Sequence, residues 1–259
     1  MFPILRIGPL QLQTHLLLTL AAALLVGVGA WLRSRRRFPE VSAAEVIDIT
    51  FYLFCGVALG ALVGATLPYL LMVPFGRPLP PSWYMGWQNW FGAVTGGVLA
   101  GALYCRKHRR PFGWSLDLFA PLLPLALAVV RLGCLLAGDS YGKETTSWLA
   151  MYLPDMYGRW AMRYPSQPVD ILIGVLMAGA LFALERGLHA RRPGWYFEGW
   201  LFWLYVLVFC LQRFYLEFWR ADTPPLFGPF TWNHLYCVIG ICLALGAMAS
   251  GGQAEPVEA

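Results

Sequence analysis

Long apolar runs recur along the whole chain, and they constrain its fold more than any other feature. A helix needs roughly 20 apolar residues to cross a bilayer. The composition agrees, because 13% of the residues are charged, whereas soluble domains carry about 25%. The sequence therefore predicts an all-α, polytopic membrane protein with about seven transmembrane helices. The seven predicted spans are residues 15–32, 47–73, 91–104, 118–136, 169–184, 196–218 and 230–248.

Clusters of arginine and lysine give the predicted orientation of these spans. The loops after the first, third and fifth spans are strongly basic, and such loops stay on the cytoplasmic side. Loops 74–86, 138–167 and 221–229 then face outward, with the N-terminus outside and the C-terminus cytoplasmic. We expect residues 1–250 to form a single transmembrane domain and residues 251–259 a disordered cytoplasmic tail. Anchoring to the anionic inner leaflet explains the net charge of +5, so nothing indicates a nucleic acid partner.

The stretch 130–142 carries an unusual set of polar residues for the end of a span. Arg131 closes the apolar run, and Asp139 follows eight residues later. A charge at this depth costs roughly 2.5–3.5 kcal/mol on insertion scales, so it usually faces a polar cavity and marks a substrate path. Glycines in the same stretch let the backbone turn sharply and approach a ligand. They are Gly133, Gly138 and Gly142.

The end of the sixth predicted span carries a second charged set. Arg213, Glu217 and Arg220 are spaced i, i+4 and i+7, so we expect them to share one helix face. Arginine presents a planar fork of donors that suits phosphate, which favours an anionic lipid headgroup held here while Glu217 orients one arginine. The alternative is an interfacial salt-bridge network that only fixes the helix. Arg131 favours the first interpretation, because it is predicted to lie at the same depth.

Three further features have a structural and a functional interpretation. Gly92 lies in a glycine-rich tract, residues 89–101, which indicates close helix packing or a surface that a lipid approaches. His234 begins the last span, as an interfacial histidine without chemistry or as part of a substrate site. The six cysteines form no CxxC pair and are typical of apolar packing residues. Since no His/Cys cluster has ligand spacing, we expect neither a metal site nor a cofactor.

Six segments carry recognisable motifs in a fixed order. They are Arg6-Ile7-Gly8-Pro9-Leu10, Gly64-Ala65-Thr66-Leu67, Phe91-Gly92-Ala93 with Gly96, Arg131 through Gly142, Arg163-Tyr164-Pro165-Ser166-Gln167, and Arg213-Phe214 with Glu217 and Arg220. In order and spacing they resemble the motifs of prolipoprotein diacylglyceryl transferases, bacterial inner-membrane enzymes that lipidate lipoprotein precursors. The resemblance covers nearly the whole chain.

The resemblance implies a reaction and its partners. In that family the diacylglyceryl group of phosphatidylglycerol moves to the lipobox cysteine thiol of a prolipoprotein signal peptide, and glycerol phosphate leaves. The site then lies in the plasma (inner) membrane, toward its outer, periplasmic face, within the lipid bilayer. Arg131, Arg213 and Arg220 would bind the phosphate, and Asp139 would take the thiol proton. Glu217 would orient an arginine, and the predicted substrate-binding residues are Gly92, Gly133, Gly138, Gly142, Arg220 and His234.

The chain departs from the family pattern mainly in residues suited to proton transfer. The motif histidine is Phe91, the second-span arginine is Thr66, and the hallmark asparagines are Cys134 and Ala137. The hallmark glutamate is Asp139, the tyrosine of the N-terminal span falls near His15, and the tyrosine before Arg213 is Phe209.

These departures leave two other functions open. One is a non-catalytic relative that binds anionic phospholipid or lipoprotein, which the loss of the motif histidine favours. The other, a small-solute transporter, is weaker because the chain shows no inverted repeat and its spans contain few prolines. Retention of the charged residues and of Gly142 favours the transferase, since a lipid binder has less need of a carboxylate beside a buried arginine.

Overall fold

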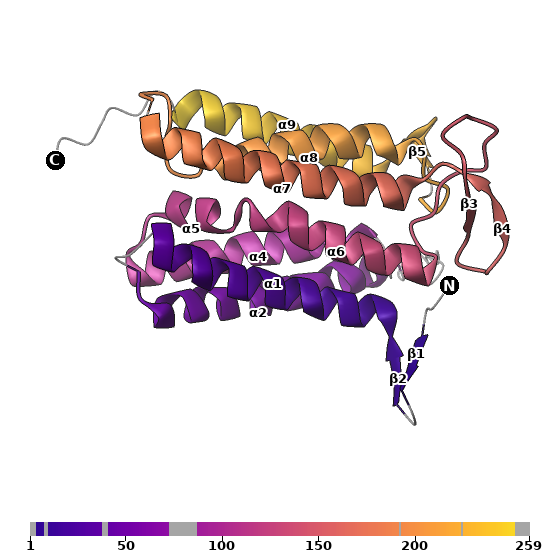
Figure 1. Ribbon diagram of the computed structural model, residues 1–259, viewed down its shortest axis with the longest axis horizontal. Helices are drawn as coiled ribbons and strands as arrows, with labels where there is room; N and C mark the ends of the chain where they lie inside the picture. Colours follow the sequence, from indigo (N-terminus) through magenta and orange to yellow (C-terminus); the bar gives the residue numbers. More distant parts are fainter. Residues whose placement is uncertain are drawn as a thin grey trace. The chain divides into compact units, whose positions relative to one another are not determined.

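The computed structural model describes residues 4–7, 10–37, 41–72, 87–191, 193–223 and 225–251, and most of them are helical (Figure 1). The helices are α1 (Thr14–Arg37), α2 (Ala43–Met72), α4 (Trp87–His108), α5 (Phe112–Phe119), α6 (Leu122–Ala137), α7 (Ser166–Arg191), α8 (Trp200–Glu217) and α9 (Trp232–Gly251). The chain forms two compact units, one of residues Met1–Val28 with Leu116–Ala259 and one of residues Gly29–Ser115.

Short strands lie outside these helices, which the all-α prediction did not include. They form three antiparallel two-stranded sheets: β1 (Ile4–Ile7) with β2 (Leu10–Gln13), β3 (Met151–Pro154) with β4 (Trp160–Arg163), and β5 (Pro225–Phe227) with β6 (Phe230–Thr231). Pairs this small provide local hydrogen bonds for loop backbone and leave the protein mainly helical.

The described helices account for most of the predicted membrane spans. Five are long and apolar enough to cross a bilayer, and α5 with α6 makes a sixth if this bent pair is one span. Helix α4 covers the predicted third span over 22 residues but is not among these six. The structure therefore agrees with a polytopic helical membrane protein, and the count of seven stays a prediction, as does the orientation of the termini.

The predicted span 118–136 is wrong as a single straight helix. The chain bends by 46° between α5 and α6. The break is at Pro121, which precedes α6, because proline lacks the N–H that would continue a helix and its ring clashes with the preceding turn. The residues before the break, Phe112–Phe119, form a separate short helix.

In the unit Gly29–Ser115, α2 and α4 pack closely through glycines. A Cβ atom on Gly60 would lie 2.1 Å from the carbonyl oxygen of Gly92, and one on Gly92 would lie 2.1 Å from that of Gly60. Gly56 and Gly96 make a similar contact one turn away. Small residues are what allow two membrane helices to approach this closely.

A capping box fixes the start of α2 in the same unit. The backbone N–H of Glu45 donates to Ser42 Oγ, and the N–H of Ser42 donates to the Glu45 carboxylate, which satisfies two backbone donors at the helix terminus. Glu45 also forms a 2.7 Å ion pair with Arg110, which follows α4. The beginning of α2 is thus joined to the end of α4.

In the other unit, α7 packs against both α6 and α8, and α8 packs against α9. The buried core between these helices is apolar and contains Ala120, Met177, Leu181, Leu188, Leu201 and Tyr205. The buried carboxylate of Asp117 accepts hydrogen bonds from the backbone N–H groups of Gly199 and Phe202, at 2.9 and 3.2 Å. It therefore caps the first turn of α8, which has no side-chain cap of its own at Gly199.

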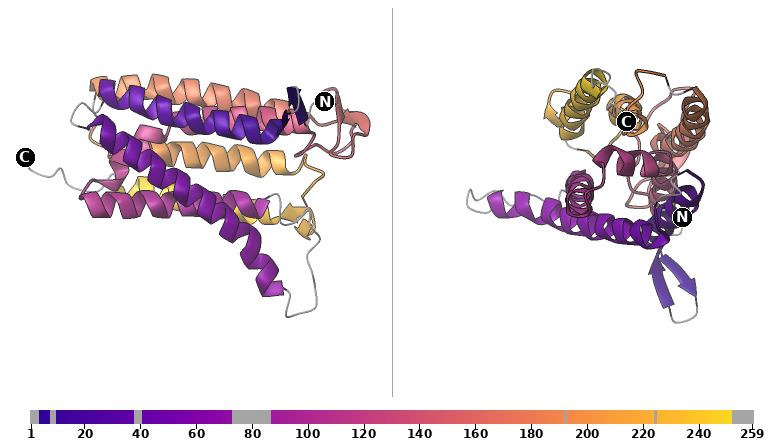
Figure 2. Two further views of the ribbon diagram at one scale, coloured as in Figure 1. Left: turned by 90° about the horizontal axis from the view of Figure 1, so that it is seen from below. Right: turned by 90° about the vertical axis from the view of Figure 1, so that its left-hand side faces the viewer.

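The longest loop of this unit and its small sheets β3–β4 and β5–β6 lie at one end (Figure 1). The β3–β4 hairpin and the β5–β6 pair lie at the same end of the unit in Figure 1, and the side view in Figure 2 agrees. Helices α6 and α8 end here, and α7 and α9 begin here. The charged residues predicted at the ends of spans therefore meet at this end of one unit.

Candidate functional site

A single carboxylate joins two arginines from different helices. Oδ2 of Asp170, near the start of α7, lies 3.0 Å from Nε of Arg131 in α6 and 3.5 Å from Nη1 of Arg213 in α8. The three side chains are at most 14% exposed. Removing one member of a buried ion pair costs about 3–5 kcal/mol. Asp170 therefore holds both guanidinium groups at a common point.

Glu217 extends this chain of charges along α8. Its Oε2 accepts a 2.7 Å hydrogen bond from Nη2 of Arg213, which confirms the pairing predicted from their i, i+4 spacing. Its Oε1 accepts hydrogen bonds from Oγ1 of Thr231, at 3.0 Å, and from Nδ2 of Asn233, at 2.7 Å. The carboxylate is 0% exposed, so both oxygens are satisfied without water and the Arg213 side chain is held in one orientation.

Arg220 lies one turn beyond the end of α8 at Glu217, and its backbone N–H donates to the carbonyl of Glu217 at 3.2 Å. The shared face of the two side chains stays a prediction. Arg220 forms an ion pair with Asp222, with 2.8 Å between Nε and Oδ1. Burial alone would lower the pKa of Arg220, but the Asp222 carboxylate raises it above its ordinary value, so the guanidinium stays charged.

Backbone contacts hold the loop after α6 against the end of α8. Gly142 pairs with Arg220 in an isolated β-bridge, and the N–H of Lys143 donates to the carbonyl of Trp219 at 2.7 Å. A Cβ atom on Gly142 would lie 2.1 Å from the carbonyl oxygen of Tyr164. Glycine is therefore required at 142 for close packing of two backbone segments, whether or not a ligand approaches it.

The turn between Gly138 and Ser140 is bonded to both α6 and α7. Gly138 ends α6 in the left-handed conformation, with φ 83°, as helix-terminating glycines commonly do. Ser140 is also left-handed, with φ 59°. Its Oγ accepts a 3.2 Å hydrogen bond from Nη1 of Arg131, and its carbonyl accepts one from Ser166 Oγ at 2.9 Å. Gln167 Nε2 donates to the carbonyl of Asp139 at 2.8 Å, so the turn is held on both sides.

The β3–β4 hairpin is held by a buried carboxylate. Asp155 lies within 3.3 Å of both Arg159 and Arg163. Burial would raise the pKa of Asp155, but hydrogen bonds from the backbone N–H groups of Arg159 and Tyr157, and the Arg159 side chain, lower it below its ordinary value. Arg163 also donates to the carbonyl of Gly142 at 3.5 Å, so the hairpin supports the loop beside the arginines.

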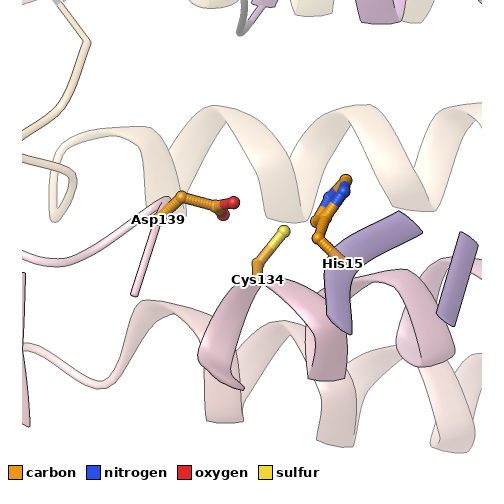
Figure 3. Close-up of side chains that lie close together, drawn as sticks. All are labelled: His15, Cys134 and Asp139. Carbon is orange, nitrogen blue, oxygen red and sulfur yellow. The ribbon is translucent and has the colours of Figure 1, made fainter. Parts of the chain in front are cut away.

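A second cluster combines three residue types that bind metals. The ligand atoms of His15, Cys134 and Asp139 lie within 4.8 Å of one another, and in Figure 3 the Cys134 sulfur points into the space between the carboxylate and the imidazole. A Cβ atom on Gly133 would lie 3.3 Å from Cα of His15. Gly133 therefore allows the start of α1 to approach α6 and bring His15 to the cluster.

His234, in the first turn of α9, is 2% exposed. Its Nδ1 accepts a 2.9 Å hydrogen bond from the backbone N–H of Thr231. The ring packs against Phe214, Phe218 and Phe230, with ring centroids 4.4–5.3 Å apart. These contacts give His234 a place in the packing around Glu217, and a contact with substrate stays a prediction.

Comparison with known proteins identifies the family of this chain. The sequence profile described as prolipoprotein diacylglyceryl transferase matches residues 3–250. The chain belongs to the prolipoprotein diacylglyceryl transferase family. The resemblance noted from its motifs is thereby confirmed, and the matched residues include both clusters described above.

Individual relatives are similar over most of their length. The phosphatidylglycerol–prolipoprotein diacylglyceryl transferase of Nitratidesulfovibrio vulgaris is 31% identical, over 95% of this chain and 93% of the relative. The protein of the same name from Pseudomonas paraeruginosa is 29% identical, over 93% and 88%. That from Geobacter sulfurreducens is 31% identical, over 77% and 75%.

Two positions of the family motifs, Phe91 and Gly92, belong to the other unit. Gly92 belongs to the unit Gly29–Ser115 and packs on Gly60 of α2, which accounts for a glycine there without a ligand. A substrate contact at Gly92 stays a prediction. The side chain of Phe91, which stands at the position of the family's histidine, falls outside the described residues.

Asp170 stands out in the sequence as a carboxylate at the outer end of a span, at the same predicted depth as Arg131 and Arg213. Sequence reasoning marked it by this depth but did not place it between the two arginines. It also missed the His15–Cys134–Asp139 cluster, because His15 is far from the other two in sequence and shows no ligand spacing. The shared depth of these residues near helix ends was the only available hint.

Proposed function

We propose that this protein transfers the diacylglyceryl group of phosphatidylglycerol to the lipobox cysteine of prolipoproteins and releases glycerol phosphate. The relatives named above are named for this reaction. The observation that carries the proposal is the buried chain Arg131–Asp170–Arg213–Glu217. It supplies fixed cations inside a membrane protein, where a phosphate ester would need them.

The chemistry of the arginines supports this proposal. Each guanidinium has five N–H donors, and the carboxylates of Asp170 and Glu217 hold those of Arg131 and Arg213 in fixed directions. Positive groups that are already oriented stabilise a leaving phosphate without reorganisation during the reaction. Arg131 and Arg213 act on the departing phosphate, and Arg220, fixed by Asp222, binds the headgroup.

The remaining predicted residues receive roles by the same reasoning. Asp139 takes the proton of the incoming thiol, because the thiolate is the nucleophile. Gly133, Gly138 and Gly142 shape the backbone beside the substrate, with Gly92 and His234 as further contacts. Glu217 orients Arg213.

The protein acts in the bacterial inner membrane on lipids of the bilayer. We assign it seven spans within one transmembrane domain, residues 1–250, with an outer N-terminus and a cytoplasmic tail, residues 251–259. The reaction then takes place toward the outer, periplasmic face, where signal peptides of prolipoproteins present their cysteine. The basic loops described from the sequence support this orientation.

A transfer assay tests the proposal. The purified full-length protein in detergent is given phosphatidylglycerol and a lipobox peptide, and release of glycerol phosphate is followed, with a Cys→Ser peptide as control. We expect release that depends on the peptide cysteine. No release while phosphatidylglycerol stays bound would refute the transferase and favour the non-catalytic lipid binder.

Substitutions link this activity to the arginines. Arg131→Ala and Arg213→Ala should each abolish release while the protein still inserts into the membrane. Arg186→Ala, on an exposed position of α7, is the matched control and should leave release unchanged. Normal transfer by either site variant would refute the assignment of the phosphate site.

A further inference from the structure

We propose that His15, Cys134 and Asp139 bind a Zn²⁺ ion, and that its fourth coordination position takes the lipobox thiol as a thiolate. The thiol's part in this proposal rests on the proposed function, whereas the metal site stands on its own residues. It replaces the expectation of no metal, which rested on spacing in the sequence alone.

The geometry of the cluster is close to that of a zinc site. The three ligand atoms lie within 4.8 Å of one another. Around one tetrahedral Zn²⁺, with bonds of about 2.0–2.3 Å, such atoms are about 3.4–3.6 Å apart. Each side chain therefore has to move by only about an ångström to close on the ion. In Figure 3 the Cys134 sulfur lies between the Asp139 carboxylate and the His15 side chain.

Three protein ligands leave one coordination position for a substrate. Structural zinc sites use four protein ligands, whereas catalytic ones use three and keep the fourth open. Among the described residues, the cluster comprises His15, Cys134 and Asp139 and no fourth ligand. A thiolate and an imidazole favour Zn²⁺ over Mg²⁺ or Ca²⁺, which prefer oxygen ligands.

The charges around the cluster suit a divalent cation. The thiolate of Cys134 and the carboxylate of Asp139 together neutralise Zn²⁺, which keeps the net charge near zero where charges are costly. Cys134 is 4% exposed. Oδ1 of Asp139 is buried and has no hydrogen-bond partner among the described residues, while the Cys134 side chain forms a hydrogen bond with this carboxylate. A metal ion would replace the shared thiol proton and contact both groups.

Arg131 connects this cluster to the phosphate site. Its Nη1 lies 3.9 Å from Sγ of Cys134 and its Nε lies 3.0 Å from Asp170. A guanidinium beside a metal-bound sulfur stabilises the thiolate as an outer-shell partner. The same side chain therefore serves the zinc ligand on one side and the ion-pair chain on the other.

The reaction step follows from this arrangement. When the peptide thiol binds Zn²⁺, the S–H bond breaks and its proton passes to water, since a coordinating thiol is deprotonated. The ion thereby replaces Asp139 in the role of activating the thiol, and Asp139 serves as a zinc ligand instead. The sulfur electron pair then forms an S–C bond with the carbon of the diacylglyceryl group that is bonded to the phosphate oxygen. The C–O bond breaks, and its electron pair leaves with glycerol phosphate, stabilised by Arg131 and Arg213. Zinc changes no oxidation state, and the thioether product leaves as a weaker ligand.

Zinc binding is measured without reference to activity. The full-length protein in detergent is stripped with a chelator, loaded with Zn²⁺, passed through gel filtration and analysed for metal. We expect one Zn²⁺ per chain. Cys134→Ser, His15→Gln and Asp139→Asn should each weaken binding by more than about 100-fold, the upper limit for losing an outer-shell partner. Cys242→Ser, at an exposed cysteine of α9, should bind zinc normally.

A measurement on the wild-type protein tests the metal site independently of the variants. Loading the wild-type protein with Co²⁺ should give a sulfur-to-cobalt absorption band if Cys134 is a ligand. A wild-type protein that takes up no Zn²⁺ and shows no such band overturns the metal site. Normal zinc binding by a correctly folded Cys134→Ser variant does the same.

The role of the thiol is tested with the lipobox peptide. Adding the peptide should strengthen the sulfur-to-cobalt band, and the Cys→Ser peptide should not. Removing zinc should abolish transfer, and adding it back should restore transfer. Full transfer by the zinc-free protein overturns the thiolate role but leaves the proposed function intact. A peptide-dependent band without any transfer has the opposite meaning, since it supports the site and refutes the transferase.

Discussion

Asp170 is the residue on which the charged cluster depends most. It lies between Arg131 and Arg213, so Asp170→Asn leaves two buried guanidinium groups without their common counter-ion. We expect a lower melting temperature, because breaking a buried ion pair costs about 3–5 kcal/mol. Transfer should fall as well, since the two cations then repel each other. Thermal unfolding and the transfer rate check this.

The matched control for this change is Asp48→Asn, at an exposed position of α2. It removes a carboxylate of the same type without touching the arginines. If Asp170→Asn behaves like this control in both measurements, the ion pairs of Asp170 have no energetic importance.

A second residue-scale prediction separates charge from geometry. Arg213→Lys keeps the positive charge but loses the planar fork that contacts both Asp170 and Glu217. We expect the transfer rate to fall by about 10²-fold or more, the loss seen when one oriented donor is removed. Arg186→Lys, on the exposed side of α7, should have no effect. A fully active Arg213→Lys enzyme would show that charge alone suffices.

At the scale of elements, one glycine sets the packing of α7 on α6. A Cβ atom on Gly174 would lie 2.8 Å from the carbonyl oxygen of Pro124 and 3.1 Å from Cβ of Ala128. Gly174→Ala should therefore lower stability by about 1–3 kcal/mol through overpacking. Gly179→Ala in the same helix meets no atom within 4 Å and should be neutral or slightly stabilising. Equal melting temperatures for the two variants would contradict this.

The β3–β4 hairpin should lose stability in acid. The folded pKa of Asp155 lies below its ordinary value of 3.8, so its contribution is complete above that pH. It is lost as the pH falls through 3.8 toward the lowered pKa, where the folded state must take up a proton. Hydrogen exchange of the amides of Met151–Arg163, corrected for intrinsic rates, should rise over this range. In Asp155→Asn it should be high at every pH.

The sequence predicts a helix well where a long apolar run defines it. Helices long and apolar enough to cross a bilayer occur where the sequence predicts spans, at α1, α2, α7, α8 and α9, because a long apolar run is a property of one segment. The bend at Pro121 was missed because prolines also begin helices. The strands β3 and β4 were missed because four-residue strands inside a long loop leave little periodicity to detect.

At the scale of the whole molecule, the proposed topology predicts which loops a reagent can reach. Trp148 is 89% exposed in the loop between α6 and α7, which we assign to the outer face. A cysteine at 148 should be labelled by a membrane-impermeant maleimide in intact cells, and a cysteine at Arg109 only after permeabilisation. Labelling of the unmodified protein, measured in parallel, gives the background from its six native cysteines. The reverse pattern would invert the topology.

The composition of the site was only partly accessible from the sequence. Arg131, Arg213 and Glu217 were identifiable because a charge in an apolar run is rare whatever surrounds it. Their connection through Asp170, and the meeting of His15 with Cys134, depend on which helices are neighbours and how each is rotated. Depth along a helix can be read from sequence, but the direction of a side chain toward another helix requires the packed structure.

The cap that Asp117 places on α8 has a consequence for how the molecule can move. The first turn of this helix is tied by hydrogen bonds to Asp117. Its last turn is tied through Arg213 to Asp170 and through Glu217 to Thr231 and Asn233. A shift of one residue along the axis is about 1.5 Å, enough to break bonds at both ends together. Helix α8 therefore cannot act as a piston. Any movement that admits a lipid would have to leave the axial position of α8 unchanged.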